Sequence, residues 1–351
     1  MQYCTLVFLL NRLIIALVLR KLLGEKMNIA VLANLKEDAP VNKEDPPGRW
    51  DDLDDRGTVD AILLALHELG HNAQYFPATL DSINDLRKFA PDLCFNSSEG
   101  HYGDSREAQM PAILDSLRIP YTCAGVLGMS LSHNKAVAKK MFRDTHIPTA
   151  NFVVVRDGIN IPSHTMKYPL FVKPAVEGSS IGINDAAIVY NEEELVRQVK
   201  YVRSIIDSLI LVEEYVAGRE FTIGILGNEV LPIVEIISPT GFYSNSQKED
   251  LNSQVRRISP APLSKKDTVA FQALARRAMN VLHLYDVCRM DMRMDAAGKP
   301  YVLEVNPIPL MDPDPNQASL IFAAVTAGYT YRDVVRKIIE SAARRWNLKL
   351  N

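Results

Sequence analysis

Two alternating segments near the C-terminus constrain the fold of this chain more than any other feature. Residues 289–294 (RMDMRM) and 302–306 (VLEVN) alternate polar and apolar side chains, and the turn-like segment 295–300 (DAAGKP) joins them. Successive side chains of a strand point to opposite faces, so the pattern predicts an antiparallel hairpin. Its apolar face, which we expect to pack on a core, carries Met290, Met292, Leu303 and Val305. Its polar face carries Arg289, Asp291, Glu304 and Asn306.

The polar face of this hairpin has the chemistry of a metal and polyphosphate site. Two carboxylates and an amide oxygen, from Asp291, Glu304 and Asn306, are ligands that a hard divalent cation prefers. The guanidinium of Arg289 beside them suits an anionic ligand such as a polyphosphate. An antiparallel sheet with one charged face in solvent gives the same pattern, so this alternative stays open for the hairpin taken alone.

The composition is that of an α/β protein with two or three domains. The chain has 351 residues and a formal net charge of −3, and its lysines and arginines are not gathered into one stripe. A surface for nucleic acid needs a basic stripe, so we expect no nucleic acid partner. No C-x-x-C pair occurs, which argues against a zinc site and a disulfide framework and fits a cytoplasmic location. The four cysteines are Cys4, Cys94, Cys123 and Cys288.

The first 26 residues differ in composition from the rest of the chain. Residues 4–19 are strongly apolar, but Asn11 and Arg12 interrupt them, and they fall short of the ~20 residues that span a bilayer. Positive charge follows this run, whereas in a secretory signal it precedes the run. We expect translation to begin at Met27, residues 1–26 to lie outside the fold, and no membrane partner. A membrane anchor is the alternative.

From Met27 onward, strand-like and helix-like segments alternate. Strands are expected at 28–33, 72–76 and 92–96, and helices at 59–69, 80–89 and 106–117. This order predicts a parallel sheet with helices on both faces, in an N-terminal substrate-side domain over residues 27–130. The acidic loop 36–56 interrupts this domain early. We expect its charges to be solvated, and a role in a binding surface is the alternative.

The middle third combines a lysine-ended strand with a glycine- and serine-rich turn. The strand 170–174 contains Lys173, and the turn 177–182 (EGSSIG) follows it. Backbone N–H groups and hydroxyls of such a turn can bind phosphate oxygens, and a lysine adds positive charge. The strand 209–212 then runs into EEYVAGREF at 213–221. Backbone groups there can bind a purine edge, and a carboxylate can accept ribose hydroxyls. Each fragment alone also fits a flexible turn or a charged loop.

Together and in this order, the motifs resemble those of the ATP-grasp superfamily, and within it the D-alanine–D-alanine ligase family. The similarity runs from Met27 to about Arg345 and rests on the segments FVKPAVEGSSIGI, LVEEYVAGREFTIGILGNEVLP, CRMDMRM and LEVNPIPLM. It implies an α/β chain with the ATP-grasp fold, in which a central subdomain over 131–216 and a C-terminal subdomain over 217–346 follow the parallel-sheet domain. ATP and Mg²⁺ are the implied cofactors, with two ions expected and Mn²⁺ able to substitute.

The resemblance also assigns roles to individual residues. Those implied to hold the nucleotide are Lys135, Lys173, Ser179, Glu213, Glu214, Tyr215, Val216 and Glu220. Those implied to act in catalysis are Arg289, Lys248, Ser180 and His101. Those implied to bind the magnesium ions are Asp291, Glu304 and Asn306. Within the first set, the lysines would contact the phosphates, residues 213–216 the adenine, and Glu220 the ribose.

The activity that the resemblance implies is an ATP-dependent ligation. An acceptor oxygen is phosphorylated, the amine of an amino acid then displaces the phosphate, and ADP and phosphate are released. The expected partners are therefore small-molecule substrates, an amino acid and an acceptor, and a second copy of the chain in a homodimer.

Three departures from the family pattern concern the substrates. The loop 35–56 lacks the E-x-E-V-S-like segment whose glutamate holds the first amine in the family. Glu249 replaces an aromatic residue after Lys248, and Leu310 stands in the family's P-G-M turn. We therefore expect a tailoring ligase of small-molecule biosynthesis, for example one that adds an amino acid to a mycosporine core. A D-alanine–D-alanine ligase of peptidoglycan synthesis and a non-catalytic nucleotide-binding regulator are the alternatives.

Overall fold

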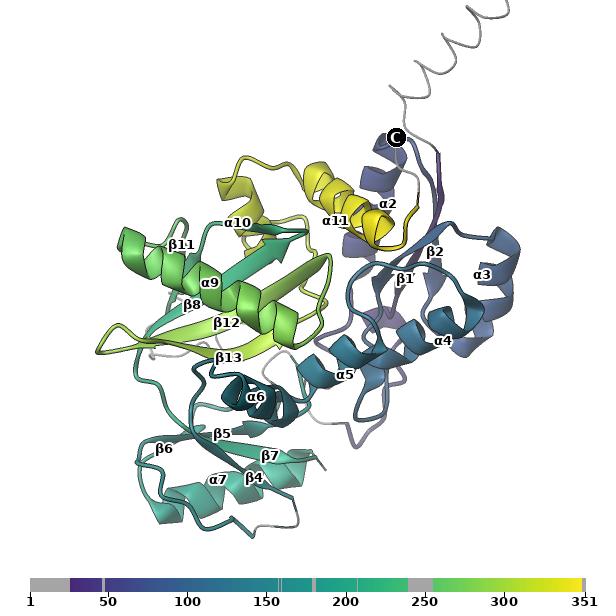
Figure 1. The fold of residues 1–351 in the computed structure, drawn as a ribbon. Coiled ribbons are helices and arrows are strands. Elements are labelled where there is room, and N and C mark those ends of the chain that lie inside the picture. Colours follow the sequence, from purple (N-terminus) through teal and green to yellow (C-terminus); the bar gives the residue numbers. More distant parts are fainter. Residues whose placement is uncertain are drawn as a thin grey trace, which may run out of the picture.

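The computed structural model describes residues 26–45, 48–156, 158, 160–178, 181–206, 208–238 and 255–348. In this part of the chain, three sheets form the framework (Figure 1). The first sheet is parallel, and the other two are antiparallel. The predicted α/β class with an N-terminal parallel sheet is confirmed.

The N-terminal unit is a three-stranded parallel sheet in the order β2-β1-β3. Its strands and longer helices are β1 (Asn28–Ala33), α2 (Arg56–Glu68), β2 (Asn72–Pro77), α3 (Ile83–Phe89), β3 (Leu93–Ser97) and α4 (Gln109–Leu117). Every residue of β3 is buried, as are the last five of β1, which is why residues 29–33 and 93–95 are continuous apolar runs. The strands and helices predicted for this region are confirmed to within a few residues.

The central unit contains a four-stranded antiparallel sheet in the order β4-β7-β5-β6. Its elements are α5 (Val126–His133), α6 (Lys135–Asp144), β4 (Phe152–Val155), β5 (Leu170–Pro174), β6 (Ile188–Val189), α7 (Glu192–Ile205) and β7 (Ile210–Glu214). Asn191 caps α7 by accepting a hydrogen bond from the backbone N–H of Glu194. Leu195, Val199 and Val202 recur at helical spacing and belong to the buried core of this sheet, so α7 covers one of its faces.

The C-terminal unit is a six-stranded antiparallel sheet in the order β11-β10-β8-β12-β13, with β9 paired to β8. Its elements are β8 (Gly218–Leu226), β9 (Glu229–Val230), β10 (Val234–Ile237), β11 (Arg256–Ile258), α9 (Lys265–Val281), β12 (Val287–Asp295), β13 (Pro300–Asn306), α10 (Ser319–Thr326) and α11 (Tyr331–Arg345). The three helices share a core cluster with the apolar side chains of β8, β12 and β13. Helix α11 also packs against α2 and so joins this unit to the N-terminal one (Figure 1).

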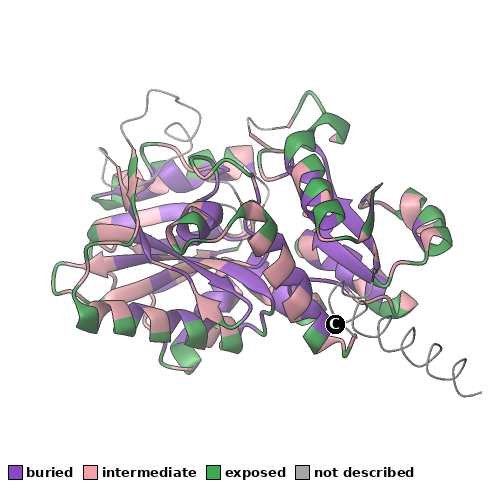
Figure 2. Ribbon diagram, turned by 90° about the horizontal axis from the view of Figure 1, so that it is seen from above, coloured by how far each residue is buried: buried purple, intermediate pink, exposed green. Residues whose placement is uncertain are grey.

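The buried residues lie mainly in and around the three sheets. Figure 2 shows buried residues concentrated on the strands and on the inner sides of the helices, with exposed residues along the outer helix faces. The three sheets lie within the segments 27–130, 131–216 and 217–346. The exact domain boundaries stay a prediction, and residues 1–25 of the predicted extension lie outside the described residues.

The C-terminal hairpin forms as predicted, with one correction. Met290 and Met292 are fully buried and Val305 is nearly so, whereas Asp291 pairs with Glu304 across the two strands. The register shifts directly after Asp291, so that Val302 stands opposite Met292. Leu303 is the extra residue of this bulge and lines a cavity, so the prediction that it packs on the core is wrong.

Candidate active site

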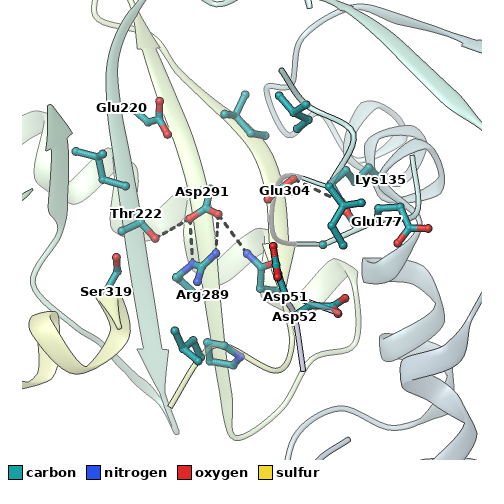
Figure 3. Close-up of a pocket in the computed structure, with 18 of the residues that line it drawn as sticks. Asp51, Asp52, Lys135, Glu177, Glu220, Thr222, Arg289, Asp291, Glu304 and Ser319 are labelled. Atoms are coloured by element: carbon teal, nitrogen blue, oxygen red, sulfur yellow. Dashed lines mark hydrogen bonds and ion pairs between the residues drawn. The ribbon is translucent and has the colours of Figure 1, made fainter. Parts of the chain in front are cut away.

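A cavity of about 790 Å³ is lined by residues of both antiparallel sheets and of the N-terminal unit. The polar face of the hairpin forms one wall, and the end of β5 with the segment after β7 forms another. Loops of the N-terminal unit close the side where acidic residues gather (Figure 3). The cavity brings together the predicted residues Lys135, Lys173, Glu213, Glu214, Tyr215, Val216, Glu220, Arg289, Asp291, Glu304 and Asn306.

Asp291 is the centre of the polar face. Its carboxylate accepts a hydrogen bond from Thr222 Oγ1 at 2.7 Å and another from Asn306 Nδ2 at 3.2 Å. The guanidinium of Arg289 binds both of its oxygens, at 3.2 Å from Nε and 3.1 Å from Nη2 (Figure 3). Glu304, directly opposite, lies 3.7 Å from Lys135 Nζ. The register of the two strands therefore places both carboxylates and the amide on one surface.

These side chains fit a magnesium-nucleotide site. In the described part of the chain, no three histidine, cysteine or acidic side chains are arranged to hold a metal by themselves. Mg²⁺ commonly uses one or two carboxylates and takes its other ligands from water and phosphate oxygens. Asp291, Glu304 and Asn306 offer that partial set beside lysines that suit the phosphates. The donor set is thus suited to a metal that arrives with a polyphosphate.

A chain of buried charges surrounds Lys173, which is predicted to contact the phosphates. Glu213 Oε1 lies 2.8 Å from Lys173 Nζ, and its Oε2 lies 2.7 Å from Lys139 Nζ. Lys139 also donates to Thr149 Oγ1 at 2.6 Å. Burial opposes the charged form of Lys173, but the combined attraction of Glu213 and nearby carboxylates raises its pKa. Burial lowers the pKa of Lys139, so the pKa values of the two lysines are shifted in opposite directions.

The buried carboxylate of Glu213 therefore lies between Lys139 and Lys173. Burial would raise the pKa of Glu213, but the two lysines outweigh burial and lower it. The next residue, Glu214, accepts hydrogen bonds from Asn151 Nδ2 and the Lys167 backbone N–H. Backbone groups of this segment remain the predicted adenine contacts.

Arg293 is a residue of this wall that the sequence did not single out. Its Nη1 donates to Glu220 Oε2 at 2.9 Å, its Nη2 donates to the Gly218 carbonyl oxygen at 2.7 Å, and its guanidinium lies 4.9 Å from the ring centroid of Tyr215. Arg293 thus orients the predicted ribose carboxylate. Strand alternation could have indicated this residue, because Arg293 is two residues beyond Asp291 and therefore lies on the same face of the strand.

The acidic loop does not behave as predicted. Asp54 is 6% exposed and accepts a hydrogen bond from Ser97 Oγ at 2.5 Å. Asp52 forms an ion pair with Arg106, which is itself buried. Leu53 between them is 2% exposed and anchors the segment, and the backbone N–H of Asp54 donates to Asn34 O beyond the end of β1. The prediction that these charges are solvated is wrong for Asp52 and Asp54, and both line the cavity.

Because the carboxyl group of Asp54 is buried, we expect the stability of the folded protein to depend on pH. Burial raises the pKa of Asp54 from 3.8 to about 6. The folded chain therefore holds this proton more tightly than the unfolded chain does, and the associated stability is lost as the pH rises towards and through 6. Relative to Asp54→Asn, the wild type should lose about 1–1.5 kcal/mol of unfolding free energy between pH 5 and pH 8. Urea unfolding of both proteins at the two pH values measures this, and an equal difference at both would contradict it.

Four predicted catalytic or nucleotide residues do not lie in the described cavity wall. Ser179, Ser180 and Lys248 fall outside the described residues. His101 is described but is not among the residues that line the cavity. Its ring packs edge-on against Trp50 with 5.6 Å between the centroids, and burial lowers its pKa. The catalytic roles of these four residues stay predictions.

The chain is similar to several known proteins. Residues 141–340 match the family model described as "D-ala D-ala ligase C-terminus". A D-alanine–D-alanine ligase of Syntrophotalea carbinolica is 35% identical over 289 residues, which cover 82% of this chain and 91% of the relative. An uncharacterized protein of Sinorhizobium fredii, y4sG, is 29% identical over 340 residues, covering 91% of this chain and 98% of the relative.

A solved structure supports the fold. The D-alanine–D-alanine ligase of Bacillus anthracis complexed with ATP superimposes with a TM-score of 0.72 at 22% identity, covering 92% of this chain and 99% of the other. None of the helices in the described part of the chain combines the length and apolar composition that crossing a bilayer requires.

Proposed function

The chain belongs to the D-alanine–D-alanine ligase family of ATP-dependent carbon–nitrogen ligases. Because its sequence departs from the family pattern around the substrates, we propose that it is a tailoring ligase with an acceptor other than D-alanine. The acceptor oxygen attacks the γ-phosphorus of ATP and ADP leaves. The amine of an amino acid then attacks the activated carbon, loses a proton, and phosphate leaves. A mycosporine core is the kind of acceptor we propose.

One observation carries the proposal. The polar face of the β12–β13 hairpin lines the same cavity as Lys173 and the acidic segment that contains Asp52 and Asp54. Phosphoryl transfer needs in-line positioning and neutralised charge more than covalent help from the protein. The nucleotide end of the cavity offers both, whereas the N-terminal end is built from a loop that departs from the family pattern. We therefore propose that this chain differs from the D-alanine–D-alanine ligases in its acceptor and not in its use of ATP.

Each group at the nucleotide end has a proposed task. Lys135 and Lys173 bind phosphate oxygens, and Glu220, oriented by Arg293, accepts the ribose hydroxyls. Asp291, Glu304 and Asn306 would hold Mg²⁺, which supplies charge neutralisation to the triphosphate. Arg289 lies on the same face, within reach of Asp291, and stabilises the transferred phosphoryl group.

A second candidate is D-alanine–D-alanine ligation itself. It is favoured by the 35% identical relative that bears that name. The non-catalytic regulator is disfavoured, because a protein that only binds nucleotide has no use for a metal and arginine face directed at the phosphates. Homodimerisation and a cytoplasmic location are further proposals from the family resemblance, and analytical ultracentrifugation tests the first.

Phosphate release separates the candidates. The protein is incubated with ATP and Mg²⁺ and with single amino acids, pairs of amino acids, or an amino acid and a mycosporine-type core. We expect release only when both an amino acid and a non-amino-acid acceptor are present. Release with D-alanine alone would establish the second candidate instead, and no release with any combination would favour the regulator.

A further inference from the structure

Residues 48–54 of the N-terminal unit reach across to the glycine-rich turn of the central unit. Arg49 Nη1 lies 3.0 Å from Glu177 Oε2, although the two residues are 128 positions apart in the chain. A Cβ atom on Gly178 would lie only 3.4 Å from the carboxylate of Asp52. Residues 48–54, which we call the acceptor loop, therefore lie directly against the start of the turn. In Figure 3, Asp52 and Glu177 lie at the same side of the cavity.

Arg49 is fixed on its own side of the cavity as well. Its Nη2 donates to the His101 carbonyl oxygen at 3.3 Å, and its guanidinium lies 5.0 Å from the centroid of the Trp50 ring. Trp50 packs edge-on against Tyr102, with 6.0 Å between the ring centroids. The side chains of Arg49 and Glu177 are only 20% and 9% exposed, so water and salt screen their attraction less than at an open surface.

Glu177 connects this contact to the phosphate end of the cavity. Its carbonyl oxygen accepts a hydrogen bond from Lys135 Nζ at 2.6 Å. Lys135 also lies 3.7 Å from the carboxylate of Glu304. The side chain of Glu177 thus pairs with Arg49, and its backbone carbonyl oxygen accepts the hydrogen bond of Lys135. Glu177 is therefore the point at which the acceptor loop meets Lys135.

We propose that Arg49 is a positioning residue that couples the acceptor end of the cavity to its nucleotide end. Through Glu177, it holds the acceptor loop against Lys135, the lysine proposed to bind the phosphates. The inference rests on the proposed placement of ATP, and Arg49 itself touches neither substrate. A fixed contact between the two ends helps to keep water from an activated acceptor. The planar fork of an arginine offers separate N–H groups in fixed directions, one to the carboxylate of Glu177 and one to the His101 carbonyl oxygen.

Fluorescence of Trp50 tests the coupling without turnover. The chain has two tryptophans, so Trp346→Phe leaves Trp50 as the single reporter. Adding Mg²⁺ and a non-hydrolysable ATP analogue should reduce acrylamide quenching of Trp50, because a nucleotide bound at Lys135 and the Arg49–Glu177 contact stabilise each other. Arg49→Ala should remove this response and weaken analogue binding by about 5–10-fold. If Trp346→Phe does not fold, the difference between the wild type and Trp50→Phe supplies the same signal.

Two further variants separate coupling from a general structural effect. Arg197→Ala is the matched control, because Arg197 pairs with Glu193 at the surface, with side chains 70% and 86% exposed. It should change neither the quenching response nor the affinity. Exchanging the charges, with Arg49→Glu and Glu177→Arg together, should restore part of the response that each single substitution removes. A wild-type response in Arg49→Ala would overturn the proposal.

The result also distinguishes this inference from the proposed function. If the analogue binds to the wild type but leaves the quenching of Trp50 unchanged, the coupling is overturned while the proposed function stands. If the wild type does not bind the analogue at all, the proposed function is wrong, and so is the coupling that depends on it.

Discussion

Glu304→Ala is expected to lower the rate of phosphate release by about 10²–10³-fold. Glu304 stands opposite Asp291 on the polar face of the hairpin and is one of only two carboxylates in the proposed metal set. Without this carboxylate, Mg²⁺ would be held less tightly. The negative charge of the triphosphate would then be less neutralised during phosphoryl transfer. Initial rates with the substrate pair that supports release measure the effect. The Mg²⁺ dependence of ATP-analogue binding gives a second measurement that does not need turnover.

Glu193→Ala is the control for this substitution. It makes the same chemical change on α7, where the Glu193 side chain is 86% exposed. Its rate and metal dependence should equal those of the wild type. If Glu304→Ala matched the wild type as well, the assignment of Glu304 as a metal ligand would be wrong.

Glu213→Ala is expected to cost about 3–5 kcal/mol of stability in the nucleotide-free protein. The substitution leaves Lys139 and Lys173 facing each other, with side chains 0% and 5% exposed, without the carboxylate that separates their charges. An unpaired buried charge loses its hydration and gains nothing in return. The shift of the urea-unfolding midpoint measures the cost.

The neighbouring Glu214→Ala provides the matched comparison. The Glu214 carboxylate accepts hydrogen bonds from Asn151 and the Lys167 backbone N–H at the surface, so its removal should cost only about 1 kcal/mol. Equal costs for the two substitutions would show that the two lysines tolerate the loss of Glu213. In that case, the buried charge chain would not be a source of stability.

The hairpin and the parallel sheet could be predicted because their signals are local. Alternation at 289–294 assigns Arg289 and Asp291 to one face and Met290 and Met292 to the other, and the structure confirms this. The same rule extends to Arg293, which binds Glu220. The position of Leu303 could not be read in this way, because one extra residue in a bulge shifts the alternation, and nothing in the segment 302–306 marks the bulge.

The acceptor loop could not be predicted because its partners are distant in the sequence. A run of acidic residues is usually solvated, and only Leu53 in its middle indicates an anchored segment. The partners of Asp52 and Asp54 are Arg106 and Ser97, which the fold brings in from beyond β2. Pairing between charged groups of this kind depends on tertiary structure, so local pattern alone could not show that the loop closes the cavity.

The central claim is that a metal-bound triphosphate lies across the polar face of the β12–β13 hairpin. A crystal grown with Mn²⁺ and a non-hydrolysable ATP analogue tests it most directly, because manganese is located by its anomalous scattering. We expect manganese peaks within about 2.5 Å of side-chain oxygens of Asp291, Glu304 and Asn306, bridged to the phosphates. Bound nucleotide with its metal away from these three side chains would contradict the claim.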